Sequence, residues 1–104
     1  MSSDQLFGLP EENVKSIKQA FVRYPHVECA VLYGSRAKGN YRANSDIDLT
    51  LTGDQLDLSE LLRIENEIDD LLLPYKVDLS IKSLIDNPNL LEHIERIGIT
   101  FYQK

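Results

Sequence analysis

The sequence predicts an α+β fold, because stretches with strand character alternate with stretches in which apolar residues recur at helical spacing. Three short apolar-rich runs predict strands at about 27–33, 46–52 and 75–82. Helical patterns precede the first run, separate the second from the third and follow the third. With 104 residues the chain has room for one hydrophobic core. We therefore expect a single domain that spans residues 1–104.

Proline and acidic residues mark the helix ends. The first helix is expected to begin at Pro10 and to end near Tyr24, because Pro25 cannot continue it. Residues 1–9 read as a loose lead-in. The second helix begins at a capping box, Asp57 to Glu60, and runs to about residue 73, before Pro74. The apolar stripes of these two helices are Val14, Ile17, Ala20 and Phe21, and then Leu61, Ile64, Ile68 and Leu71.

A third helix begins at Pro88, and Gly98 is its expected C-cap. Its apolar side is formed by Leu90, Leu91, Ile94 and Ile97. Residues 99–102 are expected to add a short edge strand. This helix and the terminal Phe101 and Tyr102 could form a contact surface for a partner, although core packing explains them more simply.

The second and third strands alternate between polar and apolar residues, so each is expected to have one buried face. The polar positions are Asp46, Asp48, Thr50 and Thr52 on the second strand, and Lys76, Asp78, Ser80 and Lys82 on the third. Asp78 is thus predicted to lie on a polar strand face, as are Asp46 and Asp48.

The residues between the first two strands carry the chemistry. Gly34 allows a close backbone approach to a ligand, and Ser35 stands where a short helix, within 34–40, should begin. Its hydroxyl and the free N–H groups of a first helical turn favour an anion such as phosphate. Asp46 and Asp48 follow on one strand face, and their oxygens suit Mg²⁺ or Mn²⁺. The segment predicts a phosphate grip beside a divalent metal site.

Gly34-Ser35, followed after eleven residues by Asp46-Ile47-Asp48, resembles the signature of the nucleotidyltransferase superfamily related to DNA polymerase beta. Over the sixteen residues GSRAKGNYRANSDIDL the chain is most similar to minimal nucleotidyltransferases, the small proteins often found beside HEPN-domain partners. The resemblance implies the nucleotidyltransferase fold, a small mixed β-sheet of three to four strands with helices packed on one face.

The resemblance also implies a site. In this family a third carboxylate comes from a later strand, and Asp78 fits that place. Asp46, Asp48 and Asp78 would then be both the catalytic residues and the ligands of two Mg²⁺ ions, or of Mn²⁺. ATP or another nucleoside triphosphate would be the substrate. The nucleotide would be held by Gly34, Ser35, Arg36, Lys38 and Arg42.

The reaction that the resemblance implies is transfer of a nucleoside monophosphate, expected to be AMP from ATP, to a protein or other hydroxyl acceptor. The expected partner is a HEPN-domain helical protein, with this chain as the antitoxin-like subunit. Larger relatives carry extra domains for base and acceptor, so a homodimer or hetero-oligomer is expected here. The alternative is a non-catalytic nucleotide-binding subunit that binds and neutralises a helical partner protein.

Simpler explanations exist for each of these residues. An Asp-x-Asp pair is often a pair of surface acids, and Ser35 could only cap its helix. Arg36, Lys38 and Arg42 could be solvated charges. His26 and His93 lack metal-ligand spacing, and we expect neither to have a functional role.

Composition excludes several classes of function. The net charge of −6 argues against broad nucleic-acid binding. The single cysteine, Cys29, cannot form an internal disulfide, and its strand position predicts a buried thiol. No secretory signal or membrane span is visible in the sequence. We therefore expect a cytoplasmic location and no membrane association.

Overall fold

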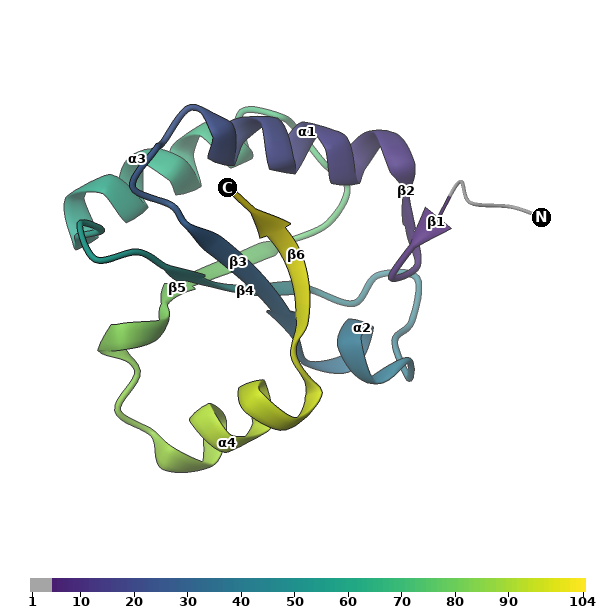
Figure 1. Ribbon diagram of the computed structural model, residues 1–104. Coiled ribbons are helices and arrows are strands. Elements are labelled where there is room, and N and C mark those ends of the chain that lie inside the picture. Colours follow the sequence, from purple (N-terminus) through teal and green to yellow (C-terminus); the bar gives the residue numbers. More distant parts are fainter. Residues whose placement is uncertain (1–4) are drawn as a thin grey trace.

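The predicted strands form one mixed sheet in the computed structural model, which describes residues 5–104 (Figure 1). The four-stranded sheet has the order β5-β4-β3-β6. Its strands are β3 (Cys29–Tyr33), β4 (Ile47–Thr52), β5 (Val77–Ile81) and β6 (Ile99–Gln103). β4 and β6 each pair antiparallel with β3, whereas β4 and β5 are parallel. The expected α+β class and small mixed sheet are confirmed, and the expected edge strand is β6.

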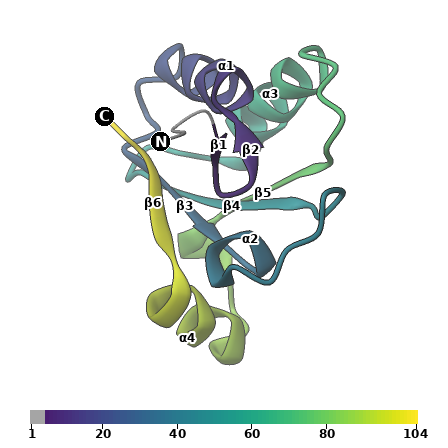
Figure 2. The same cartoon turned by 90° about the vertical axis from the view of Figure 1, so that its right-hand side faces the viewer.

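Two amphipathic helices cover one face of the sheet, α1 (Glu11–Val22) and α3 (Leu58–Asp69), as Figures 1 and 2 show. The parallel pairing of β4 and β5 requires a crossover, and α3 provides it. The Asp57 carboxylate accepts a hydrogen bond of 2.8 Å from the Glu60 N–H, which is one half of the expected capping box. α3 ends at Asp69, four residues earlier than expected.

The core lies between these helices and the inward side chains of the sheet. The predicted stripes of α1 and α3 are buried, except that Leu71 lies beyond α3 and is only partly buried. The inward residues of β3, β4 and β5 are Ala30, Leu32, Ile47, Leu49, Leu51, Leu79 and Ile81. These residues form one continuous apolar cluster.

The prediction of a loose lead-in is wrong for residues 5–9; residues 1–4 lie outside the described residues. β1 (Gln5–Leu6) and β2 (Leu9–Pro10) form an antiparallel hairpin. Leu9 is fully buried, and Phe7 packs against Phe101 with ring centroids 5.9 Å apart. The hairpin was missed because its pairing segments are only two residues long.

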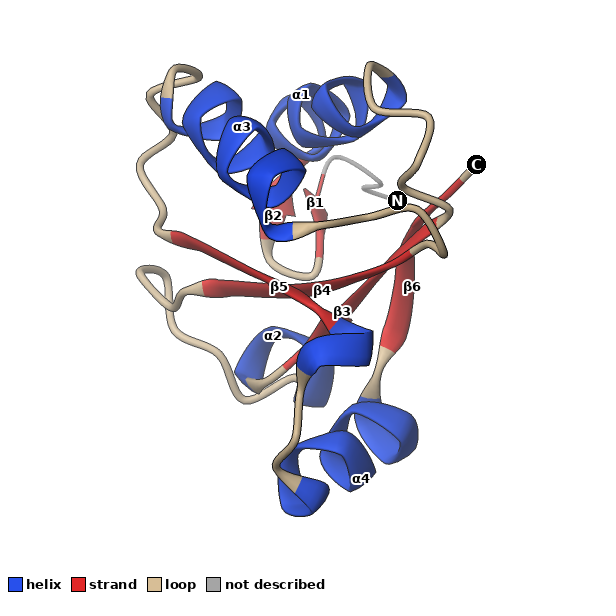
Figure 3. Cartoon of the chain, turned by 90° about the vertical axis from the view of Figure 1, so that its left-hand side faces the viewer, coloured by secondary structure: helices blue, strands red, loops and turns tan. Residues whose placement is uncertain are grey.

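The remaining helices lie on the other side of the sheet: α2 (Ser35–Lys38), the 3₁₀ turn η1 (Lys82–Leu84) and α4 (Pro88–Ile97), as Figure 3 shows. Helix packing is therefore not confined to one face. The Asn87 side chain caps α4 by accepting from the N–H groups of Asn89 and Leu90.

Gly98 follows α4 as expected, but with φ −58° it is not in the left-handed conformation. A side chain is excluded there by space, because a Cβ would lie 2.6 Å from Val31 Cγ1 of β3. Close contact between α4 and β3 explains this glycine.

Within residues 5–104, no helix has both the length and the apolar character needed to cross a bilayer.

Candidate functional site

The turn after β3 is built around Gly34. Its backbone angles, φ 78° and ψ −157°, belong to a region that residues with side chains rarely adopt. A Cβ at this position would also collide with Oδ2 of Asp48. Glycine is therefore required both by the backbone and by the carboxylate packed against it. The half-buried Ser35 follows as the first residue of α2.

Asp48 and Asp78 face each other across the parallel ladder of β4 and β5, where they are direct Cα partners. Their side chains lie on the sheet face opposite the core, because Ile47, Leu49 and Leu79 fill the core side. The next polar pair in the ladder is Thr50 and Ser80, whose hydroxyls are hydrogen-bonded at 2.9 Å. The structure thus places residues 48 and 78 on one face, as the alternation predicted.

Asp46 precedes β4 in a loop and is exposed, so it is not a strand residue as expected. Its charge still acts on Asp48. Burial, and then the negative charges of Asp78 and Asp46, raise the pKa of Asp48, whereas the positive charge of Lys76 acts in the opposite direction. This carboxylate is therefore costly to ionise without a cation beside it.

The described residues contain no group of three or more His, Cys, Asp or Glu side chains gathered closely enough to hold a metal ion. The three-carboxylate ligand set is accordingly a prediction that this geometry does not establish. The chemistry of the donors does fit a hard divalent cation, since Asp48 and Asp78 are adjacent carboxylates with mutual repulsion to relieve.

Arg36 does not fit its predicted role in nucleotide binding. Its side chain is 2% exposed. The guanidinium donates hydrogen bonds of 3.0–3.2 Å to the backbone carbonyls of Phe7, Ala43 and Ser45. It also lies over the rings of Tyr41 and Tyr75, 5.2 and 5.0 Å from their centroids. Arg36 therefore ties the N-terminal hairpin to the loop before β4, a structural role.

Lys38 and Arg42 are exposed, and their predicted contact with a nucleotide stays a prediction. The loop that carries Arg42 is ordered by a 2.8 Å hydrogen bond from the Arg42 N–H to Ser45 Oγ. Gly39, with φ 91°, ends α2, and its N–H donates to the Ser35 carbonyl at 2.9 Å.

Two residues at this site were missed by the sequence prediction. His93 of α4 accepts a 3.2 Å hydrogen bond from the Gly34 N–H through Nε2, and its ring meets Tyr33 edge-on at 6.2 Å. No local pattern indicates this contact, because it joins segments 59 residues apart. The second is Lys76. Lys76 lies just before β5, and its charge lowers the pKa of Asp48. The alternation of the predicted strand at 75–82 puts it on the face of Asp78, which could have identified it.

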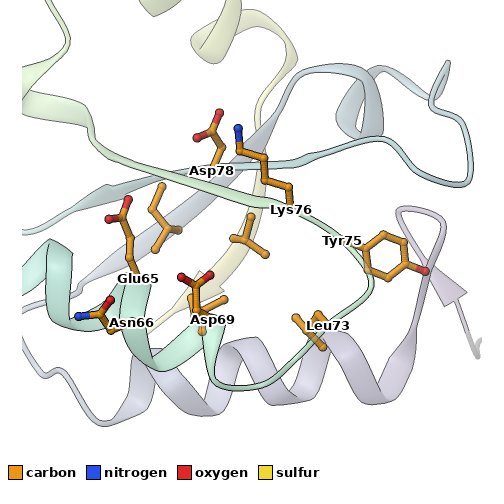
Figure 4. Close-up of a pocket in the computed structure, with 10 residues that line it drawn as sticks. Glu65, Asn66, Asp69, Leu73, Tyr75, Lys76 and Asp78 are labelled. Carbon is orange, nitrogen blue, oxygen red and sulfur yellow. The ribbon is translucent and has the colours of Figure 1, made fainter.

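A cavity of about 310 Å³ lies between α3 and β5, and Figure 4 shows the residues that line it. Glu65, Asn66, Asp69 and Tyr75 contribute to its wall. The Asp78 carboxylate points away from Asp69 and Leu73, and the Lys76 ammonium lies on the same side as that carboxylate (Figure 4). Lys76 and Asp78 line one end of the cavity, whereas Asp48 is not among its lining residues, so the cavity borders the carboxylate pair and does not enclose it.

Known proteins resemble this chain in sequence, and others resemble it in fold. MJ0126 and MJ1217 of Methanocaldococcus jannaschii, named as candidate protein adenylyltransferases, are each 36% identical over 70 residues, which is 66% of this chain and 70% of theirs. A toxin–antitoxin crystal structure with AMP-PNP matches with a TM-score of 0.71 and 21% identity, over 88% of this chain and 74% of that one.

A second solved structure matches with a TM-score of 0.66 and 18% identity, over 90% of this chain and 72% of that one. It is the complex of a tri-AMPylated Shewanella oneidensis HEPN toxin with an MNT antitoxin. At such identities, these two structures show the common fold alone.

The family model described as "Polymerase beta, Nucleotidyltransferase" matches residues 15–104, which include the Gly34 turn and both strands that carry aspartates. The turn, the paired carboxylates, the mixed sheet and the family match agree, and this chain belongs to the polymerase beta-like nucleotidyltransferase family.

Proposed function

We propose that this protein is a metal-dependent adenylyltransferase that moves AMP from ATP to a hydroxyl group of a partner protein. The observation that carries the proposal is the alignment of Asp48 with Asp78 in one ladder, directly beside the Gly34 turn. An anion-binding turn next to paired carboxylates is what a triphosphate with a bound cation requires. The names of the two Methanocaldococcus relatives support the adenylyl group and a protein acceptor.

In this proposal Asp46, Asp48 and Asp78 would hold Mg²⁺, or Mn²⁺, which when bound supplies positive charge for the triphosphate and the attacking hydroxyl. Ser35 and the N–H groups of the first turn of α2 hold the outer phosphates. The acceptor oxygen attacks the α-phosphorus, the bond to the bridging oxygen of the β-phosphate breaks, and pyrophosphate leaves. Asp78, which is exposed, orients the acceptor hydroxyl and accepts its proton.

The partner we propose is a HEPN-domain protein. The support is that several solved structures with this fold are toxin–antitoxin complexes, one of them with an AMPylated HEPN toxin. The hairpin strand β2, helices α1 and α3 and all four strands of the sheet share one continuous core, which supports the proposal of a single domain over residues 1–104.

The test is transfer of label from ATP to a purified HEPN partner in the presence of Mg²⁺. Label in the α-phosphate should reach the partner, whereas label in the γ-phosphate should not, which separates nucleotidyl transfer from phosphorylation. Asp48→Asn keeps the side-chain shape and should lower the rate by about 100-fold or more, because charge stabilisation is lost.

Asp54→Asn is the matched control, since Asp54 is exposed just beyond the other end of β4. Its transfer rate should equal that of the wild type. If the wild-type protein and Asp48→Asn label the partner equally, or neither labels it, the catalytic proposal fails.

One observation favours a second candidate, a nucleotide-binding subunit that neutralises a helical partner without catalysis: the described residues hold no preformed group of three metal ligands. Under this alternative the double variant Asp46→Ala/Asp48→Ala still neutralises its partner. Loss of neutralisation in that variant would instead favour the enzyme.

A further inference from the structure

Helix α4 comes unusually close to β3 at its C-terminal end. Gly98 allows this approach, because any Cβ there would press on Val31 Cγ1 and on the Ile94 carbonyl. Ile94 is 3% exposed and anchors the helix, yet it lies outside the main core cluster. α4 is thus held to the far face of the sheet by a small separate set of contacts, and this position brings His93 to the end of β3.

His93 makes two contacts there, one with Gly34 and one with Tyr33, the residue before it. Nε2 accepts the hydrogen bond from the Gly34 N–H, and the ring edge packs against Tyr33. A ring nitrogen that accepts must be unprotonated, so the proton of the neutral ring is on Nδ1. Within residues 5–104, no backbone carbonyl accepts the Gly34 N–H, so His93 provides its acceptor.

The conformation of Gly34 affects both the phosphate-binding turn that follows it and the carboxylate of Asp48 beside it. Its angles decide where Ser35 and the first turn of α2 point. Its missing side chain makes room for Oδ2 of Asp48. A turn that relaxed toward commoner angles would move the phosphate grip and the metal-binding carboxylate relative to each other. A single hydrogen bond to its N–H is a direct way to prevent this.

We propose that His93 is a positioning residue for nucleotidyl transfer, which holds the Gly34 turn in its strained conformation by accepting its N–H. The inference rests on the proposed function and adds α4, remote in sequence from the family motif, to the residues that the reaction depends on. His93 touches neither nucleotide nor acceptor in this role; it acts through Gly34.

Two substitutions at His93 distinguish the effect of its hydrogen-bond acceptor from the effect of its aromatic ring. His93→Phe keeps an aromatic edge against Tyr33 but has no acceptor. His93→Gln loses the ring, and its Oε1 can accept the Gly34 N–H at a similar reach. The matched control is His26→Phe, because His26 is the other histidine of the chain and is bonded to Glu60, on the side of the sheet covered by α3.

The experiment measures kcat/KM for ATP, the melting temperature, and the ¹⁵N–¹H signal of Gly34 for each variant. We expect His93→Phe to lower kcat/KM by about tenfold and to shift the Gly34 amide, with little change in melting temperature. His93→Gln should restore most of the rate, and His26→Phe should match the wild type.

Three outcomes decide the matter. If only His93→Phe is impaired, the hydrogen bond to Gly34 is what the reaction uses. If the wild type transfers AMP and His93→Phe does so equally well, or if both variants lose activity in proportion to their melting temperature, His93 is only a packing residue and the inference is overturned while the proposed function stands. If the wild type transfers no nucleotide at all, the proposed function fails, and this inference fails with it.

Discussion

The two faces of the sheet contrast sharply, although they are made by alternate residues of the same strands. On one face Leu32, Leu49 and Leu51 are fully buried beneath α1 and α3. On the other face Asp48 and Asp78 lie side by side, and the cover comes from the short α2 and from α4. The first face stabilises the fold, whereas the second holds charges that oppose one another. Along β4, Leu49 and Leu51 therefore stabilise the fold, whereas Asp48 between the inward positions is available for chemistry.

The largest effect should come from adjacent substitutions on β4 that separate the two faces. Leu49→Ala removes a fully buried side chain and should cost about 2–5 kcal/mol of unfolding free energy. Asp48→Asn should leave the fold intact while transfer is lost. Urea unfolding and the transfer assay measure both. Equal loss of stability in the two variants would contradict a division of labour between the faces.

Arg36 tests the same distinction between stabilising and functional residues, because it is a buried charge directly after Ser35 of the site. Arg36→Met should cost about 3 kcal/mol, since three backbone carbonyls lose their donor. Lys38→Met, an exposed neighbour on α2, should change stability little. Thermal unfolding compares the two. A Lys38→Met protein less stable than Arg36→Met would overturn the structural assignment of Arg36.

Gly34 and Gly39 form the next pair, because both have positive φ but only one faces a carboxylate. Alanine at either position should cost about 2 kcal/mol in backbone strain. Gly34→Ala should in addition displace Asp48 and lower transfer strongly, whereas Gly39→Ala meets no atom within 4 Å and should stay active. Activity measured at a temperature where both variants are folded provides the check.

The smallest effect is the pH dependence of Asp48. Its pKa is raised on folding above the ordinary 3.8, so the folded state holds the proton more tightly than the unfolded state. This group therefore lowers stability progressively as pH rises from about 3.8 through its folded pKa, and the penalty is constant above that. Asp48→Asn should melt higher than the wild type near pH 7 and show no such advantage near pH 3.

Added Mg²⁺ gives the matching ligand test. It should raise the melting temperature of the wild type near neutral pH, because binding to the folded state stabilises it. The Asp48→Asn protein should respond much less. An identical response of both proteins would argue against a cation at this carboxylate.

Much of the fold follows from the sequence, because strand alternation and helix stripes report the core directly. The turn at Gly34 and the polar-face position of Asp48 could also be predicted, because both depend on residues close together in the sequence, whereas their roles in catalysis stay predictions. Arg36 could not be assigned correctly, because its partners, Phe7 among them, are carbonyls that only the folded chain brings together. His93 was missed on the same grounds. The hairpin at residues 5–10 escaped because two-residue strands leave no periodicity.

The parallel register of β4 and β5 has a consequence for folding errors. Side chains alternate with a period of two, so sliding one strand by a single residue would turn Leu79 outward and send Asp78 into the apolar layer. Such a molecule would lose Leu79 and Ile81 from its core and would bury a carboxylate in their place. The register that buries Leu79 is also the register that pairs Asp48 with Asp78. Burial of apolar side chains therefore selects the correct carboxylate pairing, and the stable fold already contains it.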